Sequence, residues 1–209
     1  MAASLVVLIS GSGSNLQSII DATQNGILKG EAIVTHVLSN RKNAYGLERA
    51  SKAGIPTSVH PLLPYKKEYG NEVGRKKYDT DLSEKIIALK PSLVVCAGWM
   101  HILSPEVLAP LENRNIGIIN LHPALPGAFN GIHAIERAFE AAQQGKITKT
   151  GAMVHWVITE VDGGKPILVQ EVSIEPQDTV ETLENKIHNI EHKILVEAIH
   201  NIVSATTDA

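Results

Sequence analysis

The sequence predicts an α/β protein whose single domain is built on a doubly wound, mostly parallel twisted sheet. Apolar, strand-like runs alternate with amphipathic helical segments along the chain, which is the pattern of a parallel sheet covered by helices. The first run, residues 5–10, is apolar on both faces, as expected for a buried parallel strand. With 209 residues, 44% of them hydrophobic and 20% charged, the chain has the size and composition of one soluble domain.

In the first half, uninterrupted Val, Ile and Leu runs predict strands, and apolar residues at helical spacing predict helices that end at glycine or before proline. Residues 61–78 are polar and lysine-rich, which indicates a loop or an irregular helix start. The predicted elements are, in order, strand 5–10, helix 16–23, strand 32–39, helix 45–53, strand 57–60, helix 78–89 and strand 93–97.

The second half continues the alternation and ends in a long helix. Residues 160–164 have the composition of a turn and join the last two strands, and residues 205–209 are predicted to form a frayed tail. The predicted elements are strand 116–121, helix 132–143, strands 153–158 and 166–174, and an amphipathic helix from 179 to about 203.

Charge and cysteine content exclude several classes of protein. There are 19 Lys and Arg against 22 Asp and Glu, a formal net charge of −3, which argues against a general affinity for nucleic acid or an anionic membrane. Cys96 is the only cysteine, so no intramolecular disulfide can form. No apolar run approaches the roughly 20 residues of a membrane span, and we find no signal-peptide pattern at the N-terminus. We therefore expect a cytoplasmic protein.

Ligands of such folds bind beyond the carboxyl ends of the strands, where residues 11–15, 98–103 and 120–131 are predicted to lie. The first of these is Gly11-Ser12-Gly13-Ser14-Asn15, whose small residues and following helix start offer backbone N–H groups to an anion. A tight strand–helix turn is the alternative. A dinucleotide fingerprint fits poorly because Leu16 occupies the place of its third glycine, and a P-loop is excluded because no Gly-Lys-Ser/Thr follows. The pattern favours a monophosphate.

Asn120 and His122 point the same way at a predicted strand end, where an amide donor and an imidazole can stabilise an oxyanion and move a proton. Asp162, before two glycines, is a candidate to orient that imidazole. The structural alternatives are a turn histidine bonded to backbone and an Asp-Gly turn former. A separate H-x-x-E-H pattern at 188–192 matches a class of zinc peptidases, but no third ligand segment follows it.

Together these segments resemble the phosphoribosylglycinamide formyltransferases, folate-dependent enzymes of purine synthesis within the wider formyltransferase superfamily. The resemblance spans about residues 4–200 and implies their Rossmann-like fold. One difference is His101, which stands where an arginine is common in that family. The segments that carry the resemblance are 6–17, 46–50, 97–105, 120–123 and 161–164.

The resemblance implies formyl transfer from 10-formyltetrahydrofolate to the amine of 5-phosphoribosylglycinamide, without a metal. Asn120 and protonated His122 would donate hydrogen bonds to the oxyanion, and Asp162 would favour the imidazolium. The N-terminal half, to about residue 100, would bind phosphate, and the half from 101 to 205 would bind folate and catalyse. The implied substrate-binding residues are Gly11, Ser12, Gly13, Ser14, Asn15, Arg75, Gly131 and, for the ribose hydroxyls, Glu191. The implied folate-binding residues are Met100, His101, Ile102, Leu103, Val157, Ile158, Thr159, Glu160 and Val161.

Rival interpretations remain at this point. A formyltetrahydrofolate deformylase would use water as acceptor and would not need the phosphate loop. A non-catalytic nucleotide-phosphate binding module would not need Asn120, His122 and Asp162 to meet in space. A methionyl-tRNA formyltransferase would need a second, basic domain for which length and charge leave no room. We expect a monomer or homodimer that acts on small molecules.

Overall fold

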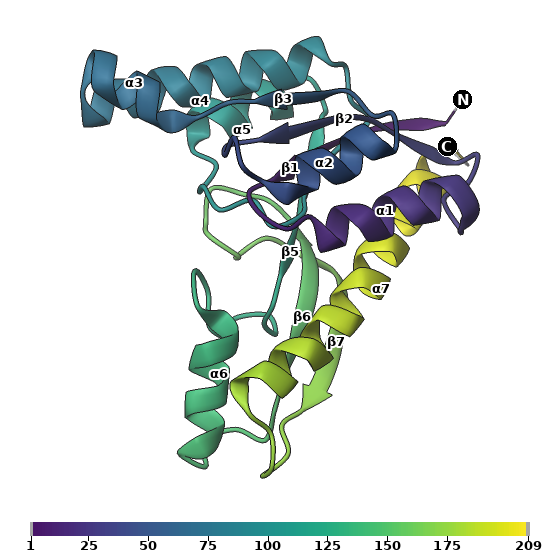
Figure 1. Ribbon diagram of the computed structural model, residues 1–209, viewed down its shortest axis with the longest axis vertical. Helices are drawn as coiled ribbons and strands as arrows, with labels where there is room; N and C mark the ends of the chain where they lie inside the picture. Colours follow the sequence, from purple (N-terminus) through teal and green to yellow (C-terminus); the bar gives the residue numbers. More distant parts are fainter. Residues whose placement is uncertain (1, 208–209) are drawn as a thin grey trace. The chain divides into compact units, whose positions relative to one another are not determined.

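The computed structural model describes residues 2–207, with side chains through residue 205. The chain divides into two compact units, Met1–Ile119 and Asn120–Ala209. The predicted α/β class with a mostly parallel sheet is confirmed. The strands of the described residues form one sheet (Figure 1), in the order β3 (Thr57–Val59), β2 (Ala32–Ser39), β1 (Ala3–Ile9), β4 (Leu93–Cys96), β5 (Gly117–His122), β6 (Lys149–Trp156) and β7 (Pro166–Ser173).

The first unit is built around β1. This strand pairs in parallel with β2 on one side and with β4 on the other, and β3 extends the sheet beside β2. Residues 5–9 of β1 are fully buried, which explains why that run is apolar on both faces. Cys96, in β4, is also buried, and burial raises the pKa of its thiol to about 12, so it is a core residue.

Two groups of helices cover the strands of the first unit. Helices α1 (Ser14–Asn25) and α2 (Tyr45–Lys52) pack on each other and on β2, while α4 (Asn71–Ala88) packs on α3 (Leu62–Tyr69) and on α5 (Pro105–Glu112). Figure 1 shows the strands of this unit running between the two groups. This is the doubly wound arrangement that the alternating sequence predicts.

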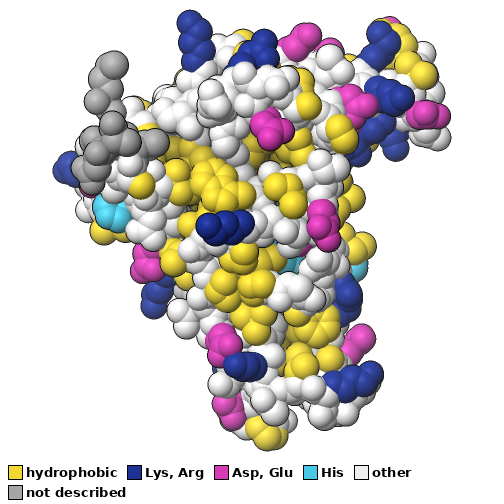
Figure 2. Space-filling model, turned by 180° about the vertical axis from the view of Figure 1, so that it is seen from behind, with side chains coloured by type: hydrophobic (Ala, Val, Ile, Leu, Met, Phe, Trp, Pro, Cys, Tyr) yellow, Lys and Arg dark blue, Asp and Glu magenta, His cyan; other side chains and the backbone are white. Residues whose placement is uncertain are grey.

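Of the two alternatives for residues 61–78, a loop or an irregular helix start, the loop is wrong, because α3 and the first half of α4 occupy the segment. None of the α3 residues is buried, so the sequence has no apolar stripe from which this helix could be predicted. Figure 2 shows charged side chains of both signs over this part of the surface. Gly70, with φ 77°, separates the helices. Gly74 lets them meet, since a Cβ there would lie 2.5 Å from the carbonyl oxygen of Tyr65. Sequence analysis also missed α5.

In the second unit, α7 (Val180–Thr207) packs on β6, β7 and α6 (Ala134–Gln143). Strands β6 and β7 pair antiparallel, and β6 begins at Lys149, four residues before the predicted start. The apolar side of α7 faces the core: Ile190 is half-buried, and the buried residues are Leu183, Ile187, Ile194 and Ile199. Because α7 continues to Thr207, the predicted tail is helical over 205–207, and residues 208–209 lie outside the described residues. No described helix is long and apolar enough to cross a membrane.

Candidate active site

His122 and Asp162 form a buried pair within the second unit. Nδ1 of His122 lies 3.4 Å from Oδ2 of Asp162, and the two side chains are 5% and 9% exposed. His122 is the last residue of β5, and Asp162 lies in the turn that joins β6 to β7. A carboxylate beside one ring nitrogen favours the tautomer in which that nitrogen carries the proton. The neutral imidazole therefore keeps its lone pair on Nε2.

That second nitrogen, Nε2 of His122, is buried and has no hydrogen-bond partner among residues 2–207. Buried polar atoms are nearly always paired in folded proteins, so an exception calls for an explanation. The explanation here is that Nε2 contacts a bound ligand, because the ring is already oriented through its other nitrogen, Nδ1. The imidazole is thus arranged to exchange a proton with a molecule bound next to Nε2.

Close backbone packing shapes the turn that carries Asp162. A Cβ at Gly164 would lie 1.6 Å from the carbonyl oxygen of Trp156, so only glycine fits there. Asp162 itself has φ 55°, in the left-handed region that Asp tolerates better than most residues. Its Oδ2 accepts a hydrogen bond of 2.8 Å from the backbone N–H of Gly131. The Asp-Gly-Gly segment is therefore a turn former, as its composition indicates, and it also aims the carboxylate at His122.

His155 joins Asn120 to this pair, and sequence analysis missed it. Its Nε2 lies 3.3 Å from Nδ2 of Asn120 and 3.5 Å from Oδ1 of Asp162, while its Nδ1 lies 2.9 Å from the carbonyl oxygen of Trp156. A carbonyl only accepts, so Nδ1 carries a proton, and in the neutral ring Nε2 accepts from the Asn120 amide. The one sequence signal for His155 is a lone imidazole within an otherwise apolar strand. The structure thus brings Asn120, His122 and Asp162 together through a fourth residue.

Burial and charge act in opposite directions on the titrating groups. Burial lowers the pKa of His122 and outweighs the Asp162 carboxylate, which raises it, so the pKa lies below the ordinary value for histidine. Burial raises the pKa of Asp162, but the adjacent His155 ring and the hydrogen bond from the Gly131 N–H more than offset it, so that pKa lies below its ordinary value. The free protein therefore holds a carboxylate beside a neutral imidazole near pH 7.

The predicted phosphate loop lies in the first unit and is supported from behind by α2. Gly13 has φ 71°, and a Cβ there would lie 2.5 Å from Cα of Gly46. The N–H of Gly46 donates to the carbonyl oxygen of Gly11 at 3.1 Å, and Nε of Arg49 donates to that of Ser12 at 2.9 Å. The close approach to Gly46 and the left-handed φ require glycine at 13, and the two hydrogen bonds fix the path of the loop.

The remaining loop residues, Ser14 and Asn15, form the first turn of α1. Its N-cap is Gly13, which has no side chain to accept from the first N–H groups of the helix. An uncapped helix start preceded by small residues is a ready anion site. The geometry of the loop therefore suits an anion, and the predicted role in binding a phosphate stays a prediction.

The segment 98–103 combines exposed and buried apolar side chains. Met100 and Ile102 are 64% and 61% exposed, while Leu103 is buried. Nδ1 of His101 lies 3.2 Å from the hydroxyl of Tyr78, and burial is the main cause that lowers the His101 pKa. Exposed apolar side chains on a short loop suit contact with a flat, apolar ligand, and the predicted role in binding folate stays a prediction.

Arg75 is joined to the same segment. Its Nε lies 2.6 Å from Oδ2 of Asp79, and its guanidinium also donates to the carbonyl oxygen of Ile102. These contacts make Arg75 an anchor for residues 98–103, and the predicted assistance to the phosphate stays a prediction.

The second predicted folate segment precedes Asp162 in the β6–β7 connection. Ile158 and Val161 are exposed, and the carbonyl oxygen of Val161 accepts from Nδ2 of Asn130 at 3.3 Å. The segment is therefore held to the loop after β5 and leaves apolar side chains uncovered. It comprises Val157, Ile158, Thr159, Glu160 and Val161.

On α7, Glu191 is 6% exposed, while His188 is exposed and His192 is half-buried. The three residues therefore do not present one common exposed face. No group of three or more His, Cys, Asp and Glu side chains in residues 2–207 is arranged to hold a metal ion. The assignment of Glu191 to a ribose stays a prediction.

Comparison with known proteins identifies relatives over almost the whole chain. A phosphoribosylglycinamide formyltransferase of Schizosaccharomyces pombe is 81% identical over 98% of this chain and 99% of its own length. One from Saccharomyces cerevisiae is 43% identical over 96% and 97%. The crystal structure of glycinamide ribonucleotide transformylase 1 from Symbiobacterium toebii superposes with a TM-score of 0.84 at 35% identity, covering 98% of this chain and 89% of that one.

The formyl transferase family model matches residues 3–199, which include both the loop at 11–15 and the cluster around His122. The match covers far more than half of the chain, and the relatives are similar well beyond the level of a shared fold. This chain belongs to the formyl transferase family.

Proposed function

We propose that this chain transfers the formyl group of 10-formyltetrahydrofolate to the amine of 5-phosphoribosylglycinamide, the formyl acceptor for which its relatives are named. The observation that carries the proposal is the His122 imidazole, whose Nδ1 faces Asp162 while its buried Nε2 has no partner among the described residues. A nucleotide-binding module has no need of such an arrangement. An acyl transfer needs a group that accepts and then returns a proton.

His122 begins neutral, because burial lowers its pKa. As the acceptor amine attacks the formyl carbon, a C–N bond forms and the carbonyl becomes an oxyanion. Nε2 of His122 takes the proton that the amine loses, and the Asp162 carboxylate stabilises the resulting imidazolium. The imidazolium then returns the proton to the departing folate nitrogen as its bond to the formyl carbon breaks. Both products are therefore neutral at the atoms that reacted.

Asn120 stabilises the oxyanion. One hydrogen of its Nδ2 is directed to Nε2 of His155, which leaves the second hydrogen for the developing negative charge. A donor held in place before the reaction stabilises the transition state without having to reorganise. His155 is therefore a positioning residue that acts through Asn120.

The acceptor and the donor use the remaining predicted residues. The loop from Gly11 to Asn15 holds the phosphate, with Glu191 on the ribose hydroxyls. Exposed apolar residues of 100–103 and 157–161 hold the folate. The chemistry requires neither a metal nor a covalent nucleophile, and we propose that the protein acts in the cytoplasm as a monomer or homodimer.

The direct test is folate product release from 10-formyltetrahydrofolate, measured with and without 5-phosphoribosylglycinamide. Turnover that depends on the acceptor is expected. Equal turnover without it would identify a deformylase, and binding of both molecules without turnover would identify a binding module. Exhaustive chelation before the assay is expected to leave the rate unchanged, whereas a stoichiometric zinc whose removal abolishes turnover would contradict the metal-free mechanism.

A further inference from the structure

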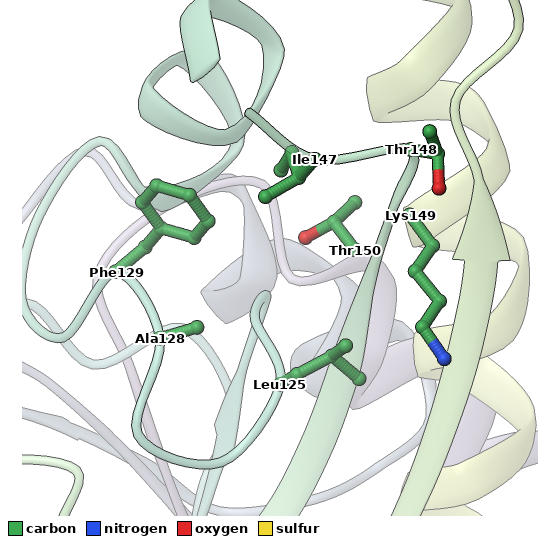
Figure 3. Close-up of a pocket in the computed structure, with 7 residues that line it drawn as sticks. All are labelled: Leu125, Ala128, Phe129, Ile147, Thr148, Lys149 and Thr150. Atoms are coloured by element: carbon green, nitrogen blue, oxygen red, sulfur yellow. The ribbon is translucent and has the colours of Figure 1, made fainter. Parts of the chain in front are cut away.

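The second unit contains a cavity of about 350 Å³ that the proposed reaction does not use. One wall is the loop that follows β5, and the other is the segment that enters β6 (Figure 3). Its volume is within the range of small-molecule sites in proteins. The residues that line it are Leu125, Ala128, Phe129, Ile147, Thr148, Lys149 and Thr150.

Apart from the exposed Thr148 and Lys149, the lining is apolar and contains one buried polar side chain. Thr150 is 2% exposed, and its Oγ1 has no hydrogen-bond partner among residues 2–207. In Figure 3 this hydroxyl lies on the side of Phe129 and Ala128, within the space that the lining residues surround. A buried hydroxyl without a partner carries a desolvation cost that a bound donor or acceptor would remove.

The cationic group at the cavity is already neutralised. Nζ of Lys149 lies 2.7 Å from Oε1 of Glu171, and in Figure 3 its side chain extends away from Phe129. A charged ligand would find no counter-ion among the other lining side chains, so the site suits a neutral one. Phe129 adds an aromatic face, which favours a ring stacked or set edge-on against it.

We propose that this cavity binds a small neutral aromatic molecule that carries one hydroxyl group, with the ring against Phe129 and Ile147 and the hydroxyl bonded to Thr150. The apolar walls supply the affinity by removing the ring from water. Thr150 supplies the orientation, because it is the lone polar side chain in the described lining that is both buried and unpaired.

The site is coupled to His122 and Asp162 through the loop that forms its wall. The N–H of Gly131, two residues after Phe129, donates to Oδ2 of Asp162, the oxygen that lies 3.4 Å from Nδ1 of His122. Phe129 itself has φ 51°, a strained conformation for an aromatic residue. A ligand that packs on Phe129 therefore acts on the segment that holds Asp162 beside His122.

The test uses phenol and toluene as probes, with methyl and imidazole resonances observed by NMR. Phenol is expected to shift the methyl signals of Leu125, Ile147 and Thr150 in a saturable way. The ring signals of His122 are expected to shift with the same saturation. Absence of saturable shifts at these methyls would overturn the site, and an unmoved His122 would overturn the coupling. Neither readout depends on formyl transfer, so the result is independent of the proposed function.

Substitutions of the lining residues distinguish binding at this cavity from weak, non-specific binding elsewhere on the protein. Thr150→Val keeps the side-chain shape but removes the hydroxyl, and it is expected to weaken phenol by about 10-fold, the value of one hydrogen bond, while toluene binds as before. Ala128→Leu fills the cavity and is expected to abolish binding of both phenol and toluene. If Ala128→Leu does not fold, Ile147→Phe fills the cavity from the opposite wall and serves the same purpose. Unchanged phenol affinity in Thr150→Val, or retained binding in a folded filling variant, would contradict the proposal.

Discussion

Nδ2 of Asn120 lies 3.3 Å from Nε2 of His155, the same nitrogen that faces Oδ1 of Asp162 at 3.5 Å. One imidazole therefore touches both the amide that we propose as oxyanion donor and the carboxylate that stabilises His122. Its other nitrogen is held by the carbonyl of Trp156. The orientation of Asn120 is thus set by a residue that need not contact substrate at all.

Replacement of His155 tests this positioning role. His155→Leu removes the acceptor for Asn120 and is expected to lower kcat by about 10-fold, the value of one neutral hydrogen bond, with the acceptor KM unchanged. His155→Gln places an amide oxygen near the position of Nε2 and is expected to recover most of the loss. Steady-state kinetics on the two folded variants distinguish them. Equal kcat in both would show that the residue only fills space.

Removal of the Asp162 charge tests the mechanism. Asp162→Asn is expected to reduce kcat by about 10²–10⁴-fold, the range of general acid–base catalysis, with acceptor affinity largely kept. The Asp162 carboxylate raises the pKa of His122, so its loss lowers that pKa further. The acidic limb of the kcat profile, which reports the loss of neutral His122, is therefore expected to move to lower pH. A limb at the wild-type pH would mean that another group titrates.

Gly13 offers a matched comparison with another glycine. Gly13→Ala sets a Cβ 2.5 Å from Cα of Gly46 in a backbone with φ 71°, whereas Gly30→Ala meets the same kind of strain at φ 83° with nothing within 4 Å. Gly30→Ala is expected to cost about 1 kcal/mol of stability, and Gly13→Ala is expected to cost more because the backbone clash adds to the same strain. Only Gly13→Ala is expected to raise the KM for the phosphorylated acceptor, because it displaces the loop. Urea unfolding and kinetics measure the two effects, and equal KM values would argue against a phosphate loop.

Glu191 is expected to matter for one substrate only. If its carboxylate accepts from the ribose hydroxyls, Glu191→Ala weakens acceptor binding by about 1.5–3 kcal/mol, the value of charge-assisted bonds, with folate affinity unchanged. Glu197→Ala removes an exposed carboxylate from the same helix and serves as the control. Titration calorimetry with each substrate gives the answer. If Glu191→Ala binds the acceptor with wild-type affinity, Glu191 does not bind the ribose hydroxyls.

Stability is expected to fall as the pH drops below the ordinary histidine pKa. Burial lowers the pKa of His60, which is 2% exposed, so the unfolded chain binds a proton at a higher pH than the folded one. The stability that the neutral ring contributes is present above pH 6.5 and is lost as the pH falls toward the lower folded pKa. Denaturant unfolding at pH 7.5 and 5.5 is expected to show a smaller loss for His60→Gln than for wild type. The exposed His133→Gln serves as control, and an unchanged loss in His60→Gln would contradict this account.

The sequence alone allowed much of this site to be predicted, because period-two spacing at a strand end and turn chemistry are local signals. Asn120 and His122 share a strand face by alternation, and the Asp162 turn is marked by its two glycines. His155 was missed for the opposite reason. A single histidine in an apolar strand has no local mark of function, and its contacts come from residues distant in the sequence. The helix at 62–69 was missed because it buries no residues and therefore shows no apolar periodicity.

The antiparallel pairing of β6 and β7 has a consequence for the order in which the site assembles. A hairpin closes within about 1–10 μs, because its ends are near in sequence. His155 and Asp162 lie on this one hairpin, seven positions apart, so their contact needs only local closure. His122 must join them across forty positions, a search that costs more loop entropy. We therefore expect the contact between His155 and Asp162 to form early in folding, and His122 to join these two residues last.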